Sequence, residues 1–227
     1  MGAGYPHIIF RFTESEIHAR MSRTGSDFWT AYVGYLDHWK AALTKAGVYH
    51  RIQLYKIADE PAVHPEIFVD QAFLDRYVAE FEARFVGKKS IISFAGTMQH
   101  PLDRILPPKA LDIILMDPYF LAAGDTTPCD DEQIRQFLYE DSPHSPVGWA
   151  LKFNKPIIVA GDAMLRETTP PRTCYVTGTL NALADDPRVA GLVWFVYDRS
   201  FVEGPLRGAA NAPAFVERVR RASVALP

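Results

Sequence analysis

The sequence is poor in cysteine and has no long apolar run. Its 227 residues include two cysteines, Cys129 and Cys174, which are too few for a disulfide scaffold and lack the spacing of metal ligands. No apolar run is long enough to cross a bilayer, and the first ten residues lack the basic and apolar segments of a signal peptide. These absences exclude a small disulfide-bonded fold and predict no membrane span.

The chain also lacks a large excess of either positive or negative charge. The chain has 24 Lys and Arg against 27 Asp and Glu, so we expect no basic patch for nucleic acid. No GxGxxG, P-loop or HExxH motif is present, so no cofactor and no metal are expected. With 48% hydrophobic residues the chain can bury a core, which excludes a disordered protein.

Short apolar runs alternate with longer amphipathic stretches, and this pattern predicts strands that alternate with helices. The predicted strands are His7–Phe12, Ile52–Ile57, Ser90–Phe94, Leu111–Met116, Pro156–Ala160 and Leu192–Val196. The predicted helices are Ser26–Ala46, Asp70–Val86, Asp131–Leu138, Val147–Phe153, Cys174–Leu183 and Ala214–Val224, with one helical turn around Pro101–Leu106.

Strands joined through helices form a parallel sheet. Continuous apolar runs such as IIF and PIIVA fit strands that are buried on both faces. Residues 1–227 therefore predict a single α/β domain, most simply an incomplete (β/α)8 TIM-type barrel of about six units. A doubly wound open sheet is the alternative.

In parallel α/β folds the reactive groups gather at the carboxyl ends of the strands. The residues at these ends are mostly carboxylates and aromatics, namely Arg11, Thr13, Glu14, Asp59, Glu60, Asp117, Tyr119, Asp162, Trp194, Tyr197 and Asp198. Carboxylates bind hydroxyl groups and aromatic faces stack on sugar rings, so this set predicts a carbohydrate partner.

Asp59-Glu60-Pro61 is the most informative segment. Because Pro61 favours an extended conformation in the residue before it, Glu60 is expected at a strand end and not in a helix. A glutamate there can protonate a leaving oxygen. The alternative is a solvated turn, in which Asp, Glu and Pro are all common.

Four segments resemble, in order, the later strand ends of the retaining (β/α)8-barrel glycoside hydrolases: KIADEP, DIILMDPY, KPIIVAGD and GLVWFVYD. The resemblance implies that Glu60 is the acid/base. It also implies that the sugar is bound by Asp59, Tyr119, Trp194, Arg11 and Tyr197. Gly161 stands where that family has its nucleophile, so the second catalytic carboxylate would be Asp162 or, ranked below it, Asp117.

These observations lead to three hypotheses about function. The first is a glycosidase that cleaves a polysaccharide or an oligosaccharide. The second, motivated by Gly161, is a catalytically silent barrel that binds carbohydrate. The third, ranked lowest, is a metal-dependent hydrolase that uses Asp59, His64, Asp117 and Asp162.

The resemblance also bears on the length. A full barrel takes about 250 residues, and matching Glu60 to the fourth barrel strand leaves the first two units missing. We therefore expect a barrel truncated at its N-terminal side. An extracellular or cell-envelope location would fit the substrate, and no sequence signal indicates a compartment or an oligomeric state.

Overall fold

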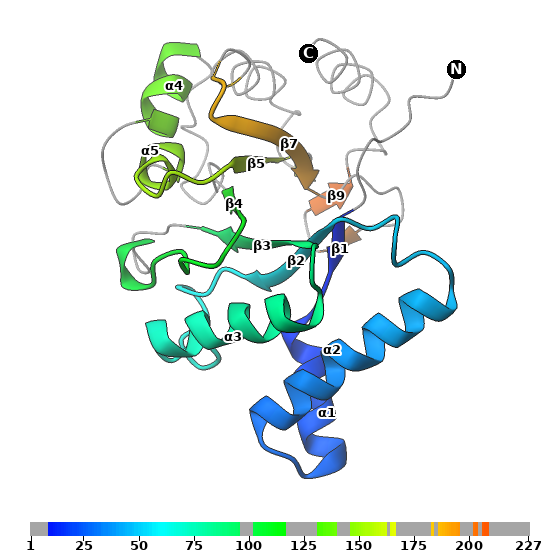
Figure 1. Ribbon diagram of the computed structural model, residues 1–227. Helices are drawn as coiled ribbons and strands as arrows, with labels where there is room; N and C mark the ends of the chain where they lie inside the picture. Colours follow the sequence, from blue (N-terminus) through cyan, green and yellow to red (C-terminus); the bar gives the residue numbers. More distant parts are fainter. Residues whose placement is uncertain are drawn as a thin grey trace. The chain divides into compact units, whose positions relative to one another are not determined.

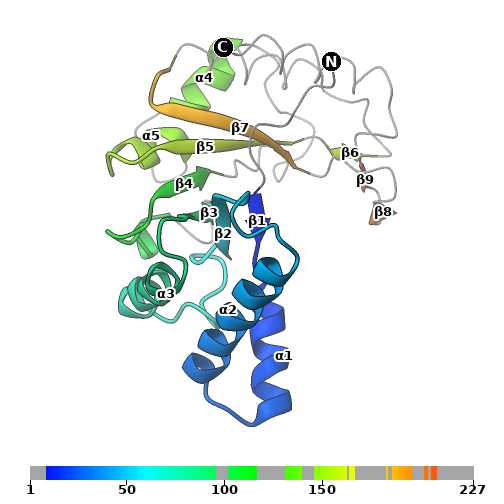
Figure 2. The ribbon, with the colours of Figure 1, turned by 45° about the vertical axis from the view of Figure 1, so that its right-hand side comes forward.

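The computed structural model describes residues 9–95, 102–116, 131–139, 146–162, 164–166, 183, 186–195, 202–203 and 206–208. The chain divides into two compact units, residues 1–94 with 103–114 and residues 95–102 with 115–227. We describe each unit by itself (Figures 1 and 2). The single domain predicted for residues 1–227 stays a prediction.

Six strands confirm the predicted parallel α/β architecture of about six units. They are β1 (Ile9–Arg11), β2 (Leu54–Asp59), β3 (Lys89–Phe94), β4 (Ile113–Met116), β5 (Ile157–Asp162) and β7 (Val189–Phe195), which follow one another in the sheet in that order. The pairs β1–β2, β2–β3 and β5–β7 are all parallel. The buried runs in β3 and β4 agree with strands covered on both faces.

In the first unit, three helices lie on one side of β1, β2 and β3 (Figure 1). They are α1 (Glu14–Thr24), α2 (Phe28–Lys45) and α3 (Gln71–Arg84). Helix α2 begins where the Asp27 side chain accepts a hydrogen bond from the Thr30 amide. Asp70 caps α3 in the same way. Gly47, in the left-handed region at φ 70°, follows the end of α2.

Helix α1 was not predicted. Its sequence ESEIHARMSRT buries only Ile17, so it lacks the apolar stripe by which α2 and α3 are recognised. The sequence predicted no element for these residues.

The second unit contains α4 (Asp131–Tyr139), α5 (Pro146–Leu151) and the β5–β7 pair. It also contains a small antiparallel sheet in the order β6-β9-β8, made of β6 (Met164–Arg166), β9 (Leu206–Gly208) and β8 (Val202–Glu203). This sheet was not predicted, because strands of two or three residues are too short to show a period.

The helical turn predicted around Pro101–Leu106 is present as the 3-10 helix η1 (Leu102–Arg104). The helix predicted at Ala214–Val224, and all of Cys174–Leu183 except its last residue, lie outside the described residues.

Aromatic rings fill the layer between the helices and β1–β3. Phe12, Tyr55, Phe81 and Phe85 contact one another with ring centroids 4.8–6.2 Å apart. Such pairs contribute beyond the area that they bury, by about 0.5–1.5 kcal/mol each. These ring contacts pack α3 against the helix-covered face of β1 and β2.

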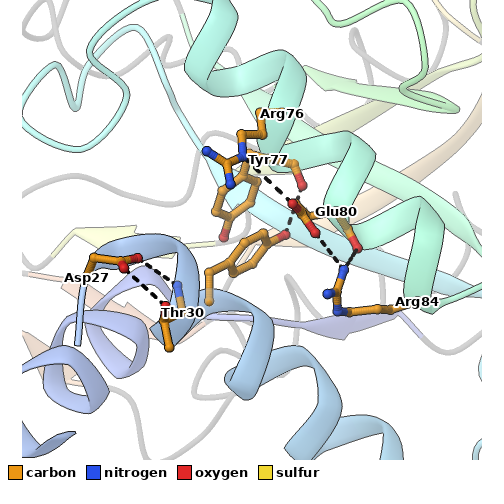
Figure 3. Close-up of polar contacts among 7 residues, drawn as sticks. Asp27, Thr30, Arg76, Tyr77, Glu80 and Arg84 are labelled. Atoms are coloured by element: carbon orange, nitrogen blue, oxygen red, sulfur yellow. Dashed lines mark hydrogen bonds and ion pairs between the residues drawn. The ribbon is translucent and has the colours of Figure 1, made fainter.

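A second contact joins α2 to α3 (Figure 3). The rings of Tyr32 and Tyr77 stack with centroids 4.0 Å apart, and the Tyr32 hydroxyl donates to the Tyr77 carbonyl at 3.1 Å. At the far end of α3, Arg84 pairs with Glu80 at 2.6 Å and lies 3.4 Å from Asp37 of α2. This packing holds Tyr77 in one orientation.

Strand β2 contains a bulge that Tyr77 supports. The β2–β3 register shifts between Lys56 and Ala58, so Ile57 is one residue in excess. The Tyr77 hydroxyl donates to the Ile57 carbonyl at 3.0 Å in a fully buried environment. The helix layer therefore supplies a partner for the carbonyl of the extra residue.

Replacing Tyr77 with Phe tests this support. The variant leaves the buried Ile57 carbonyl without its donor, so we expect the free energy of unfolding to fall by about 1–3 kcal/mol. Urea unfolding followed by circular dichroism measures it. The control is Tyr49→Phe, since Tyr49 contacts Lys88 through its ring. Equal losses in both variants would show that the Tyr77 hydrogen bond is dispensable.

Candidate functional site at the carboxyl ends of the first three strands

Five polar residues meet at the carboxyl ends of β1, β2 and β3. We call them the strand-end cluster: Arg11, Glu14, Lys56, Asp59 and Ser93. They come from β1, the first turn of α1, β2 and β3. All five belong to the first compact unit, and this end of a parallel sheet is where α/β proteins place their chemistry.

The bulge at Ile57 explains how Asp59 reaches the cluster. In a regular strand, residues three apart point to opposite faces. Here Lys56 Nζ lies 2.6 Å from Asp59 Oδ1, since the extra residue between them brings both side chains to the same face. Bulges re-aim side chains next to active sites in many proteins.

Asp59 is held by two cations and one backbone bond. Arg11 Nη2 donates to Asp59 Oδ2 at 2.7 Å, and Lys56 holds the other oxygen. The Asp59 amide donates to Glu14 Oε1 at 3.0 Å. The structure thus brings together Arg11 and Asp59, which were both predicted to bind substrate, and adds Lys56 and Glu14.

Burial raises the pKa of Glu14 above its usual value of 4.5. Hydrogen bonds from its own amide and from the Asp59 amide work against that rise, and the Asp59 charge adds to it. Glu14 therefore takes up a proton at a higher pH than an exposed glutamate does. The sequence placed Glu14 after the first strand, but nothing in it signalled the burial.

Glu60 directly follows β2, as predicted, but its backbone is not extended. Its φ is 46°, in the left-handed region that non-glycine residues rarely adopt. The prediction that Pro61 keeps the Glu60 backbone extended is therefore wrong. The Glu60 amide donates to the Ser93 carbonyl at 2.8 Å, and the Glu60 carbonyl accepts from the amides of Val63 and His64. These bonds on both sides of the residue outweigh the preference that proline imposes.

A left-handed non-glycine backbone costs about 1–3 kcal/mol and persists where the surroundings hold it. Glu60 has intermediate exposure and is tied to β3 and to the turn that follows it. An observed backbone outlier of this kind is a recognised indication of a functional position.

Ser93 was not selected as a binding residue from the sequence. It is fully buried, and its Oγ has no hydrogen-bond partner. It pairs in register with Asp59, so both side chains lie on the same face of the sheet. A serine within the apolar run SIISF was the only sequence signal.

The other predicted site residues belong to the second unit. Asp162 is the last residue of β5, so this strand runs two residues beyond its predicted end. Gly161 pairs with Trp194 and Asp162 pairs with Phe195 in the β5–β7 register. Asp117, Tyr119 and Tyr197 lie outside the described residues.

Two residues of the predicted metal set have other partners. Asp59 binds Arg11 and Lys56, and His64 Nδ1 lies 3.1 Å from Glu66 Oε1. Within the described part of the chain, no group of three or more His, Cys, Asp or Glu residues is arranged to hold a metal ion. No described helix combines the length and the apolar character that a bilayer crossing requires.

No known protein-family model matches the chain, and no curated protein matches it significantly. Solved structures do match its fold. A GH113 β-1,4-mannanase is similar with a TM-score of 0.55 and 13% identity, over 86% of this chain and 62% of that one. A β-D-glucuronidase of Dictyoglomus thermophilum is similar with a TM-score of 0.60 and 12% identity, over 87% of this chain and 36% of that one.

A β-glucuronidase of Bifidobacterium dentium gives a TM-score of 0.54 and 10% identity, over 78% of this chain and 31% of that one. The chain thus spans less than two thirds of each of these structures. At such low identity the likeness shows the fold alone, and it confirms the expected partial TIM-type barrel.

The pKa of Glu14 makes a prediction about stability. A group whose pKa is raised by folding contributes stability below its unfolded pKa, and that contribution is lost as the pH rises through the folded pKa. Wild type should therefore lose stability above about pH 4.5, and Glu14→Gln should lose less, because glutamine stays neutral and still accepts from Asp59.

Urea unfolding between about pH 4 and pH 8 measures this difference. Glu16→Gln, on the exposed side of the same helix, is the matched control. The same pH dependence in wild type and Glu14→Gln would contradict the assignment.

Proposed function

We propose that the chain, with its partial TIM-type barrel, is a glycoside hydrolase in which Glu60 is the general acid/base. The observation that carries the proposal is the backbone of Glu60, strained at φ 46° directly after β2 and held there by hydrogen bonds to β3 and to the following turn. The fold likeness to three glycoside hydrolases supports it.

In this mechanism Glu60 protonates the oxygen of the leaving sugar. The partner carboxylate is Asp162 or, ranked below it, Asp117. Asp59 is not offered for that role, because Arg11 and Lys56 occupy both of its oxygens. Arg11, Asp59, Tyr119, Trp194 and Tyr197 bind the sugar.

A carbohydrate-binding barrel without hydrolysis is the second candidate function. Gly161 favours it, because glycine occupies the position at which the resemblance places a nucleophile. The two candidates share the sugar site and differ only in turnover.

Glu60→Gln separates the two candidates. The variant keeps the size of the side chain and removes its proton, so we expect kcat on an oligosaccharide to fall by about 10²–10⁴-fold while the unfolding free energy stays unchanged. Reducing-end release from a panel of neutral and acidic oligosaccharides measures turnover. The control is Glu66→Gln, an exposed glutamate in the turn that follows.

Asp162→Asn and Asp117→Asn, tested in the same assay, identify the partner carboxylate. Unchanged turnover in Glu60→Gln would exclude the acid/base role. A wild type that binds these sugars without cleaving them would favour the second candidate.

A further inference from the structure

Two cations of the strand-end cluster bind the same carboxylate, that of Asp59. Asp59 gives one oxygen to Arg11 and the other to Lys56. The Lys56 side chain is only 13% exposed, whereas that of Arg11 is 51% exposed. Asp59 is therefore shared between the two cations, and Arg11 is the more accessible of them.

Two other carboxyl groups lie beside these residues, Glu14 and Glu60. Glu14 is partly buried and accepts a hydrogen bond from the Asp59 amide, and its pKa is raised. Glu60, in its proposed role, is protonated before it donates its proton. The raised pKa means that Glu14 keeps its proton to a higher pH than an exposed glutamate does.

Among the described residues, only one partner is given to the guanidinium of Arg11. An arginine presents five N–H groups in a planar fork that matches a carboxylate. Asp59 is the one polar partner that the described residues supply to the Arg11 side chain, through Nη2. A second carboxylate, brought by a ligand, can bind the remaining edge of the fork.

Ser93 adds a second, independent indication of a ligand. Its Oγ is fully buried without a hydrogen-bond partner, on the face that Asp59 shares. An unsatisfied buried hydroxyl costs about 1–3 kcal/mol, and a ligand hydroxyl at this face would satisfy it. A molecule with hydroxyl and carboxylate groups fits both features.

We propose that the sugar bound at the strand-end cluster is a uronic acid residue, with its carboxylate on Arg11 and a hydroxyl group near Ser93. This inference rests on the proposed function in that it takes the ligand to be a carbohydrate. It adds the chemical class of that sugar and makes Arg11 the residue that selects it.

Matched aryl glycosides that differ only at C6, with a carboxylate or a hydroxymethyl group, test the inference. We expect the kcat/KM of wild type to be about 10–100-fold higher on the uronides than on the neutral glycosides. In Arg11→Gln we expect kcat/KM to fall on the uronides and to stay unchanged on the neutral glycosides. Arg23→Gln, an exposed arginine at the end of α1, should keep it. Equal losses on both substrates, or a wild-type preference for neutral sugars, would overturn the inference and leave the hydrolase standing.

Binding measured by calorimetry distinguishes the two proposals if wild type cleaves neither substrate. Selective binding of oligouronides over neutral oligosaccharides, lost in Arg11→Gln, supports the inference although the hydrolase fails. Equal or undetectable binding of both overturns it. If Arg11→Gln does not fold, the preference of wild type for uronides is measured at low and high ionic strength. A preference based on charge weakens at high ionic strength. A preference that stays unchanged excludes the role of Arg11.

Discussion

The arrangement of the candidate site depends on one extra residue in β2. The bulge at Ile57 ends the regular alternation of the strand, and as a result Lys56 and Asp59 meet on one face. Without it, residues three apart would lie on opposite faces, and Asp59 would point toward the aromatic layer. The bulge is supported from behind by the Tyr77 hydroxyl, so the packing of α2 and α3 contributes to the geometry at the opposite face of the sheet.

Asp59 and Glu60, which follow the bulge, are both fixed by contacts with other residues. The Asp59 amide is bound by Glu14, its carboxylate by Arg11 and Lys56, and the Glu60 amide by the Ser93 carbonyl. Three elements besides β2 therefore fix where Glu60 lies. A strained φ of 46° persists because these bonds would all have to break for the backbone to relax. The proposed acid/base is thus placed by a rigid support and not by a free loop.

Much of the architecture was predictable from periodicity. The apolar stripe of α2 and α3 and the continuous runs of β3 and β4 are strong signals, and the structure confirms them. Helix α1 was missed because it buries a single residue, and the β6-β9-β8 sheet because its strands are very short. At the site, the sequence identified Arg11, Asp59 and Glu60 by their position after strands. It placed Glu14 after the first strand but gave no sign of its contact with Asp59, 45 positions away, and it did not identify Lys56 or Ser93.

The sequence by itself determined the α/β class, the order of the strands and the residues at their carboxyl ends, because these follow from local patterns of polarity. The tertiary structure decided which of those residues meet and in what state. Burial raises the pKa of Glu14, and the bulge turns Asp59 toward two cations. The left-handed backbone of Glu60 overrides the local preference set by Pro61, because hydrogen bonds to a neighbouring strand and turn are stronger than a conformational bias of one residue.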